Sequence, residues 1–381
     1  MRYALLGLFV VSVLGGCESG SAKPSDHTQN RPRDGRTADA DPSKLEGKAL
    51  YETFCAQCHG VDMKGYKADN APSLVNPTFL ASATDDYIHR SIFAGRPGTS
   101  MAGYAREIGG PLDKAAIDRI VGYLRAQGGP ATELGTAAST GDATRGAAIY
   151  ARECQKCHGD QQTRGNTVHL ANPQFLAVAS DAFIRYAIVA GRPGTPMESF
   201  AKKLDAQSTD DVVAYVRSLG ISKPEGTLPP PTGKEPLVLN PKGKEPDWKN
   251  LRADPGGPPR YVSVDELKRA FDEKRKVIVV DARPPSDWMR AHIQGAVSIP
   301  YHDMSRLAEV PKDAWVVAYC ACPHHLSGIV VDELIKRGHK KALVLDEGVL
   351  EWHRRGYPVT AAQGVQPPPK ESMHGHEGHQ H

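Results

Sequence analysis

The sequence predicts a chain of several domains, with two all-α domains followed by one α/β domain that has a parallel sheet. A motif of the form C-x-x-C-H occurs twice, each time beside segments with helical periodicity. In the last third of the chain, strand patterns alternate with helix patterns, as they do in parallel α/β sheets. Segments rich in Pro, Gly, Ser or Thr separate these parts, and a length of 381 residues is enough for two or three domains.

The first two units are an internal repeat. Residues 47–51 precede the first C-x-x-C-H motif at the same spacing at which residues 146–150 precede the second. Downstream, each unit carries the loop A-G-R-P-G-T-x-M, and each closes on an amphipathic helix pattern. We therefore expect residues 44–129 and 142–221 to share one fold.

Two cysteines separated by two residues and followed by histidine form the attachment pattern of a c-type haem. The two thiols add to the two vinyl groups of the haem, and the adjacent imidazole binds the iron as its proximal ligand. We therefore expect two covalently attached haems. The residues that hold them are Cys55, Cys58 and His59 in the first unit, and Cys154, Cys157 and His158 in the second.

An N-terminal helix, a C-x-x-C-H motif, a Pro-Gly loop with methionine and a C-terminal helix together resemble class I cytochrome c. The resemblance implies a helical haem-binding fold, electron transfer and redox partner proteins. Met101 and Met197 end the two loops and are the expected sixth iron ligands, because a thioether stabilises ferrous iron and raises the potential. The alternative is that each methionine only fills the core.

Three other side chains are rival ligands, although none of them is repeated in both units: Met63, His89 and His169. We interpret the two histidines as surface or core residues. The arginines of the repeated loops, Arg96 and Arg192, either pair with haem propionates or are solvated, and the sequence favours neither reading.

The third unit covers residues 260–360. Its apolar runs have the length of buried strands, and they fall at residues 276–280, 315–319 and 342–345. A helix pattern follows over residues 327–337. Three motifs in order, D-x-R from Asp281, H-I-x-G-A-x-x-I-P from His292 and G-x-x-x-W followed by G-Y-P-V, resemble the rhodanese domain. The resemblance implies the α/β fold, and Asp281 and Arg283 are expected to be structural.

In rhodaneses, the cysteine after the second of these strands takes up sulfane sulfur as a persulfide, and Cys320 matches that position. Backbone N–H groups at the start of the next helix would favour its thiolate. The loop departs from the family pattern because Pro323 replaces a common glycine and His325 replaces an arginine that often binds the anionic donor. Binding of the donor at a histidine would depend on pH.

Cys322 has two readings. It attacks a persulfide on Cys320, which releases sulfide and leaves a disulfide, or it is a small buried side chain. His324 and His325 lie beside these two thiols, so a metal site in the loop is a further alternative.

The first 17 residues have the pattern of a signal peptide, with a positive start and a short apolar run. Residues 14–17, L-G-G-C, resemble the lipobox of bacterial lipoproteins, which implies lipidation of Cys17 and an anchor at the periplasmic face of a membrane. The alternative is an ordinary cleaved signal peptide. Either reading exports the chain, and no other segment is long and apolar enough to span a membrane.

The remaining segments are predicted linkers and a tail. They are a flexible tether (18–43), a linker (130–141), a Pro/Gly/Lys-rich linker (222–259) and a His-rich tail (361–381). The histidines of the tail either bind a metal loosely or have no role. A net charge of +3 gives no argument for a nucleic-acid partner.

Three functions fit this combination. The first is electron transfer linked to sulfane-sulfur or thiosulfate chemistry at Cys320, with an inorganic sulfur substrate. The second is a pure electron carrier with an inactive rhodanese docking module. The third is a sulfurtransferase with redox-sensing haems. Cys320 favours the first and third, the altered loop favours the second, and a flexible linker before the third unit favours transient contact between haem and thiol.

Overall fold

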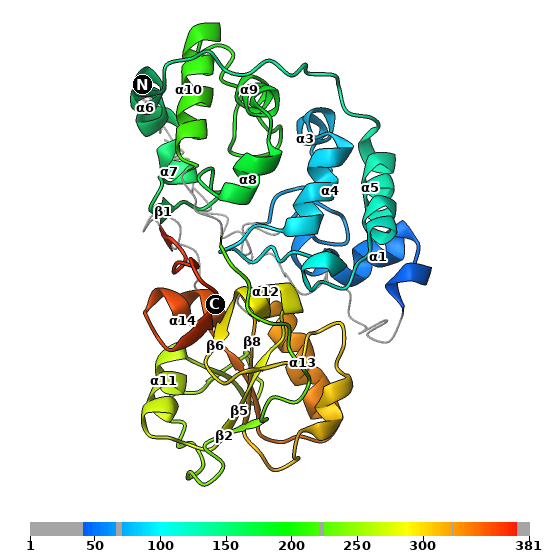
Figure 1. Ribbon diagram of the computed structural model, residues 1–381, viewed down its shortest axis with the longest axis vertical. Coiled ribbons are helices and arrows are strands. Elements are labelled where there is room, and N and C mark those ends of the chain that lie inside the picture. The colour runs from blue at the N-terminus through cyan, green and yellow to red at the C-terminus, as the bar shows by residue number, and fades with distance from the viewer. Residues whose placement is uncertain (1–40, 66–70, 221–224, 322–323, 372–381) are drawn as a thin grey trace, which may run out of the picture.

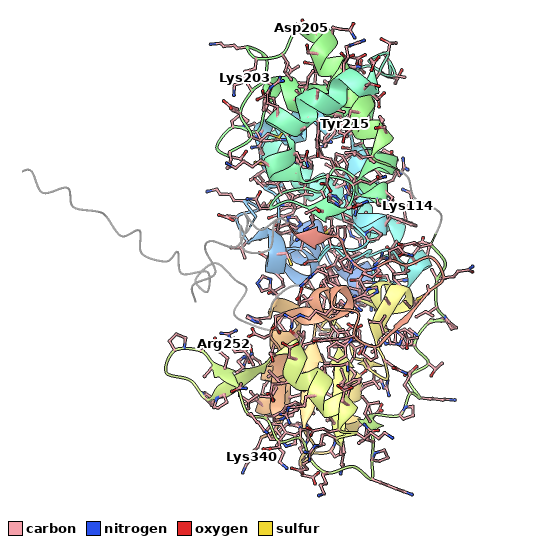
Figure 2. All side chains as sticks on the ribbon, turned by 90° about the vertical axis from the view of Figure 1, so that its left-hand side faces the viewer. Lys114, Lys203, Asp205, Tyr215, Arg252 and Lys340 are labelled. Carbon is pink, nitrogen blue, oxygen red and sulfur yellow. The ribbon has the colours of Figure 1, made fainter. Side chains whose placement is uncertain are left out.

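The computed structural model describes residues 41–65, 71–220, 225–321 and 324–371. Two helical units lie beside each other at one end of the molecule, and an α/β unit lies at the other (Figure 1). In the side view, Asp205 of the second helical unit and Lys340 of the α/β unit mark opposite ends of the long axis (Figure 2). The molecule is therefore elongated, with the first helical unit against the α/β unit.

Side-chain caps fix where the helices of the first unit begin. Asn76, Thr84 and Asp113 each accept a hydrogen bond from the backbone of the first turn that follows. Buried apolar residues on α1 and α5 pack these two helices across each other. The described helices of this unit are α1 (Gly47–Phe54), α2 (Ala56–His59), α3 (Pro77–Ser82), α4 (Asp85–Ala94) and α5 (Lys114–Gly128).

The second unit repeats this plan with its own caps, which include Asn172 before α8 and Ser180 before α9. Its described helices are α6 (Ala143–Glu153), α7 (Gln155–His158), α8 (Pro173–Val178), α9 (Asp181–Ala190) and α10 (Ala206–Ser218). A short strand, β1 (Thr163–Arg164), pairs in parallel with β11 (Lys370–Glu371) near the C-terminus.

The repeat extends to individual contacts. Arg125 in α5 and Arg217 in α10 each bind the aspartate that begins the fourth helix of their unit, Asp85 and Asp181. Each arginine also donates to two backbone carbonyls at the end of the preceding helix, those of Leu80 and Ala83 in the first unit and of Leu176 and Ala179 in the second. The expectation of one shared fold is confirmed at this level.

A glycine allows the first and last helices of each unit to approach closely. A Cβ atom on Gly146 would lie 2.0 Å from the carbonyl oxygen of Asp211 in α10, and one on Gly47 would lie 2.3 Å from that of Arg119 in α5. Backbone cannot yield as a flexible side chain can, so these positions require glycine.

Replacing Gly146 with alanine is expected to destabilise the second unit by about 1–3 kcal/mol, because the added methyl group forces α6 and α10 apart. Gly122→Ala is the matched control. It lies in α5 with nothing within 4 Å of the added Cβ, so it should stabilise by up to about 1 kcal/mol. Thermal unfolding followed by circular dichroism compares the two, and equal midpoints would contradict the close-approach argument.

The α/β unit is built on a seven-stranded sheet within the described residues. Its strand order is β2-β5-β8-β9-β4-β3, and β7 also pairs with β5. The strands are β2 (Val238–Leu239), β3 (Arg252–Ala253), β4 (Pro259–Val262), β5 (Val277–Asp281), β7 (Val297–Ser298), β8 (Val316–Tyr319) and β9 (Ala342–Leu345). A separate two-stranded antiparallel sheet pairs β6 (Ala291–Ile293) with β10 (Val359–Ala361).

The expected parallel sheet forms the centre of this unit, where β4, β5, β7, β8 and β9 run in the same direction. The two outer strands, β2 and β3, are antiparallel to their neighbours. The sheet is therefore mixed, and the expectation of a parallel sheet holds only for its core.

Helices cover both faces of the sheet (Figure 1). Alternate residues of each strand face opposite sides, so that Ile278 and Val280 pack towards α13 (His325–Lys336), whereas Val277 and Val279 pack towards α11 (Val264–Asp272) and α14 (Gly348–Arg354). The cluster on the α13 side is continuous with the cores of both helical units. The α/β unit also contains α12 (Pro285–Arg290) and a 3-10 turn, Ser305–Glu309.

The segment over residues 222–259, expected to be an extended spacer, contributes two short strands to the sheet. Val238 and Leu239 form β2 against β5, and Arg252 and Ala253 form β3 against β4. Two-residue strands at sheet edges carry too little periodicity to stand out among the Pro, Gly and Lys residues around them. The sheet thus begins before residue 260, and the segment is tied to it at both edges.

Several expectations fall outside the described residues. They are the signal peptide with Cys17, most of the tether, Cys322 and Pro323, and the four histidines near the C-terminus. Among the residues that the structure does describe, no helix is long and apolar enough to cross a membrane.

Candidate functional site

The first C-x-x-C-H motif lies where α1 ends and α2 begins, with Cys55 between the two helices. The Tyr51 hydroxyl donates to the Gly60 carbonyl at 2.7 Å and fixes the end of the motif. His59 Nδ1 lies 3.0 Å from the Pro72 carbonyl oxygen. Because a carbonyl only accepts hydrogen bonds, Nδ1 carries the proton and Nε2 keeps the lone pair that can bind iron.

The second motif has the same geometry. The Tyr150 hydroxyl donates to the Gly159 carbonyl at 2.8 Å, and His158 Nδ1 lies 2.8 Å from the Val168 carbonyl oxygen. Burial lowers the pKa of His59 and of His158, so each imidazole is neutral, the form that binds a metal. Burial also raises the pKa of the Cys55 thiol to about 12 and that of Cys154 to about 11.

These residues fit a c-type haem. Each unit offers two free cysteine thiols and one oriented imidazole in the attachment pattern. When bound, the haem supplies a one-electron redox centre.

The two methionine loops, residues 96–101 and 192–197, are closed by their own hydrogen bonds. The backbone N–H of Arg96 donates to the Met101 carbonyl at 2.7 Å, and that of Arg192 donates to the Met197 carbonyl at 2.7 Å. Met101 and Met197 end the loops half-buried. Iron ligation by these methionines stays a prediction.

The rival ligands have other surroundings. Met63 is buried in the core of the first unit. His169 Nε2 lies 2.7 Å from the Asp160 carbonyl oxygen, and His89 Nε2 lies 3.4 Å from Asp118 Oδ1. These contacts agree with the reading of both histidines as structural residues.

The two loop arginines are neither simply solvated nor left free. Arg96 donates to Ser91 Oγ at 2.8 Å and lies over the Tyr87 ring. Arg192 donates to Thr78 Oγ1 in the other helical unit at 3.3 Å and lies over the Phe183 ring. Arg192 is therefore part of the contact between the two helical units, and Arg96 packs on Tyr87, whose ring stacks on Phe183 of the second unit.

Cys320 directly follows β8, at the carboxyl end of the parallel strands. Its side chain is fully buried, and its Sγ lies 3.4 Å from the hydroxyl of Ser327 in the first turn of α13. The start of a helix favours negative charge, and this position suits a reactive thiolate. The cysteine thus lies where the sequence placed it.

The loop after Cys320 is held by a charged cluster that sequence reasoning missed. His324 adopts a left-handed backbone conformation (φ 75°), and its Nε2 lies 2.6 Å from Asp346 Oδ1. Asp346 also accepts two hydrogen bonds from Arg252, at 2.6 and 2.9 Å. Burial opposes ionisation of Asp346, but the hydrogen bonds from His324 and Arg252 outweigh it and hold the pKa of this carboxyl well below its usual value.

The sequence contained one indication of this cluster, the position of Asp346. Asp346 follows the last predicted strand, so its side chain lies at the same sheet edge as Cys320. Arg252 carried no such signal, because it falls in the segment expected to be a linker.

The start of α13 and the first C-x-x-C-H motif lie against each other. His325 is buried, and its Nδ1 lies 3.9 Å from Cys58 Sγ. Around this contact, α13 packs on α2, and the Tyr301 hydroxyl donates to the Phe54 carbonyl at 3.5 Å. Figure 1 shows the first helical unit beside the α/β unit at this point. His325 therefore faces a cysteine of the first C-x-x-C-H motif, which the sequence did not predict.

Asp281 and Arg283 form a buried ion pair, with the Arg283 Nη2 and Asp281 Oδ2 atoms 2.7 Å apart. The Tyr319 hydroxyl donates to the same carboxylate at 2.8 Å. The pair lies under the loop that leaves β5, in agreement with the structural role expected for both residues.

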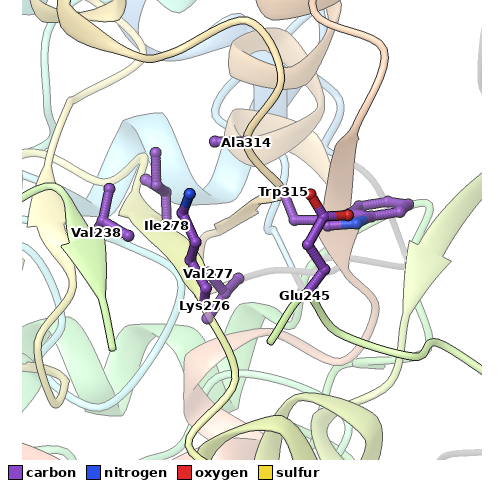
Figure 3. Close-up of a pocket in the computed structure, with 7 residues that line it drawn as sticks. All are labelled: Val238, Glu245, Lys276, Val277, Ile278, Ala314 and Trp315. Atoms are coloured by element: carbon purple, nitrogen blue, oxygen red, sulfur yellow. The ribbon is translucent and has the colours of Figure 1, made fainter. Parts of the chain in front are cut away.

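A small cavity lies elsewhere, between β2, β5 and Trp315 (Figure 3). Its volume of about 10 Å³ is room for about one water molecule, so it is not a substrate site. In the part of the chain that the structure describes, no three His, Cys, Asp or Glu side chains gather as a metal site.

Comparison with known families agrees with this geometry. Residues 42–124 and 141–216 match the family model described as cytochrome C oxidase, cbb3-type, subunit III. Residues 263–355 match the model of the rhodanese-like domain.

Known relatives of the chain are of two kinds, cytochrome subunits and a sulfurtransferase. The chain is 29% identical to the Cbb3-type cytochrome c oxidase subunit FixP of Bradyrhizobium sp. (strain ORS 278), over 48% of this chain and 62% of that protein. It is 26% identical to CcoP of Azospirillum sp. (strain B510), over 46% and 62%. It is 29% identical to a sulfurtransferase of Allochromatium vinosum, over 27% of this chain and 96% of that protein.

The chain spans about three fifths of the length of these cytochrome relatives. The matches cover both helical units and the α/β unit. The protein therefore joins two cytochrome c electron-transfer domains, whose residues fit covalently bound c-type haem, to a C-terminal rhodanese-like domain.

Proposed function

We propose that this protein is an exported dihaem cytochrome whose electron transfer is coupled to thiosulfate chemistry at Cys320. The observation that carries the proposal is the contact between His325 Nδ1 and Cys58 Sγ at 3.9 Å. It sets the start of α13, the helix that follows Cys320 in the chain, directly against the first C-x-x-C-H motif. A docking module with no part in the chemistry would not need its reactive loop at this surface.

The coupled step joins Cys320 to thiosulfate. The thiol of Cys320 and the sulfane sulfur of thiosulfate form a new S–S bond, no atom of thiosulfate leaves, and the thiol proton goes to solvent. The reaction releases two electrons, and the two proposed haems, when ferric and bound, supply two one-electron acceptors. The residues of the chain hold the thiolate at the start of α13 and exclude water by burial.

Cys320→Ser is expected to abolish reduction of the oxidised, haem-loaded protein by thiosulfate, as followed in the visible spectrum. Mass spectrometry of the parent should find the whole thiosulfate unit on Cys320. A strong chemical reductant should reduce parent and variant alike, which shows that the haems of the variant are intact. Equal reduction of both proteins by thiosulfate would contradict the proposal.

The same experiment separates the alternatives. A sulfurtransferase reaction displaces sulfite, so it leaves a persulfide on Cys320 and releases no electrons. That result would favour a sulfurtransferase with redox-sensing haems. An unmodified Cys320 would leave a pure electron carrier with an inactive rhodanese-like module.

For location, we propose export and lipidation of Cys17, with the protein held at the periplasmic face of a bacterial membrane. The L-G-G-C pattern after a short apolar run supports this proposal. Labelling with a radioactive fatty acid tests it, and Cys17→Ala should lose the label.

A further inference from the structure

Each cytochrome domain holds the methionine loop of the other. Asn172 Nδ2 in the second domain donates to the Pro97 carbonyl in the first at 2.9 Å, and Asn76 Nδ2 in the first donates to the Pro193 carbonyl in the second at 2.9 Å. The two contacts are reciprocal, because Asn76 and Pro97 occupy the same repeat positions as Asn172 and Pro193.

The accepting carbonyls lie in tight turns. Thr99 N–H donates to the Arg96 carbonyl at 3.0 Å across Pro97 and Gly98, and Gly98 has a φ of 78°. Proline followed by glycine at positive φ marks a type II turn, in which this hydrogen bond does not engage the central carbonyl. The amide from the opposite domain therefore supplies a partner that the turn lacks. The second domain repeats the pattern, with Gly194 also at 78°.

Each turn is rigidly linked to its methionine. Met101 N–H donates to Thr99 Oγ1 at 3.1 Å, and Thr99 Oγ1 donates to the Arg96 carbonyl at 2.7 Å. A force on the Pro97 carbonyl is thus transmitted to Met101 through a closed ring of hydrogen bonds.

Both asparagines have a second bond that fixes them in place. Asn172 Oδ1 accepts from the backbone N–H groups of Gln174 and Phe175, and Asn76 Oδ1 accepts from that of Phe79, so each caps a helix of its own domain. The side chains are buried, with 5% and 6% of their surface exposed.

The surrounding contacts hold the two domains together. The rings of Tyr87 and Phe183 stack with centroids 4.5 Å apart, next to Arg96 and Arg192. The asparagine bonds therefore lie within a packed interface from which water is largely excluded.

We propose that Asn172 positions Met101 and that Asn76 positions Met197, so that the sixth ligand of each haem is set by the opposite domain. The inference rests on the proposed ligation by the methionines. Loss of a positioning bond loosens the thioether from the iron, and because the thioether stabilises ferrous iron, the potential of that haem falls.

The two loops are not held equally. Thr78 Oγ1 of the first domain also lies 2.7 Å from the Gly191 carbonyl, just before the second loop. The corresponding residue in the second domain is Gln174, whose backbone N–H donates to Asn172 Oδ1 within its own domain. The Met101 loop should therefore respond more to loss of its asparagine than the Met197 loop.

Asn172→Asp provides the test in the full, haem-loaded chain. Aspartate caps a helix as asparagine does, but it presents a second oxygen to the Pro97 carbonyl in place of the N–H donor. Proton NMR of the reduced protein reports the ligated methionine methyl groups, which Met101→Ala and Met197→Ala assign, and a redox titration gives the two potentials. We expect the Met101 signal to shift or vanish and the potential of the first haem to fall, while Met197 is unchanged.

Ser180→Asp is the matched control, because it places a carboxylate at an exposed helix cap of the same domain and should alter neither methionine. Asn76→Asp should affect Met197 rather than Met101. A change in Met197 alone after Asn172→Asp, equal changes in both methionines, or no change would overturn the proposal. If Met101→Ala removes no methyl signal, the ligation itself fails, whatever the asparagine variants show.

Discussion

Replacing Asp281 with alanine is expected to destabilise the rhodanese-like domain by about 3–5 kcal/mol, because it leaves a buried charge without its partner. Arg283 is 5% exposed and Asp281 is fully buried. Although burial alone would lower the pKa of Arg283, the charge of Asp281 raises it, so the guanidinium remains charged inside the domain. The Tyr319 hydroxyl and the Arg283 side chain would both lose an acceptor.

Urea unfolding of the haem-loaded protein measures this effect. Asp265→Ala is the matched control, because its partner Arg355 pairs with it at the surface and such pairs contribute about 1 kcal/mol or less. A double variant, Asp281→Leu with Arg283→Met, should recover much of the loss, since no unpaired charge remains. Similar midpoints for Asp281→Ala and Asp265→Ala would contradict the assignment of a buried pair.

Acidification from pH 7 to pH 5 is expected to weaken the contact between the first cytochrome domain and the rhodanese-like domain through His302. Burial lowers the pKa of this histidine to about 4. Its Nε2 has no hydrogen-bond partner among the described residues, and its ring packs edge-on against Phe54, beside the first haem motif. Protonation would therefore place an unpaired charge in an aromatic contact.

The direction in which stability changes with pH follows from proton binding. An unfolded histidine takes up a proton below a pKa of about 6.5, whereas the folded state does not until about pH 4, so stability falls as the pH falls through this window. Between pH 7 and pH 5 the loss is about 2 kcal/mol. Other buried histidines also make the free energy of unfolding depend on pH. The measured quantity is therefore the difference in this pH dependence between the parent and His302→Phe, from urea unfolding at pH 7 and pH 5. Identical slopes would show that His302 does not contribute.

Local patterns predicted most of the fold. The C-x-x-C-H motifs and the repeated loops identified two equivalent helical domains, and apolar runs located β5, β8 and β9. Cys320 follows β8 as predicted, because a buried strand followed by a helix leaves little freedom for the residue between them. The edge strands β2 and β3 were missed, since two residues in a proline-rich segment carry no periodicity.

What the sequence could not supply was contact between distant segments. The cluster of Arg252, His324 and Asp346 joins three parts of the chain, and no local pattern links them. The contact of His325 with Cys58 likewise joins residues 267 positions apart. The flexible linker suggested a transient meeting of haem and thiol, whereas the structure has these two surfaces packed together.

The reciprocal asparagine bonds give the pair of cytochrome domains an internal two-fold symmetry. When two copies of one surface bind each other, residue i of one copy contacts residue j of the second, and j contacts i, as in a symmetric homodimer. Asn76 with Pro193 and Asn172 with Pro97 follow this rule inside a single chain. The tandem domains thus bind each other as the two halves of a homodimer would, and Thr78, with Gln174 at the matching position, breaks this internal symmetry.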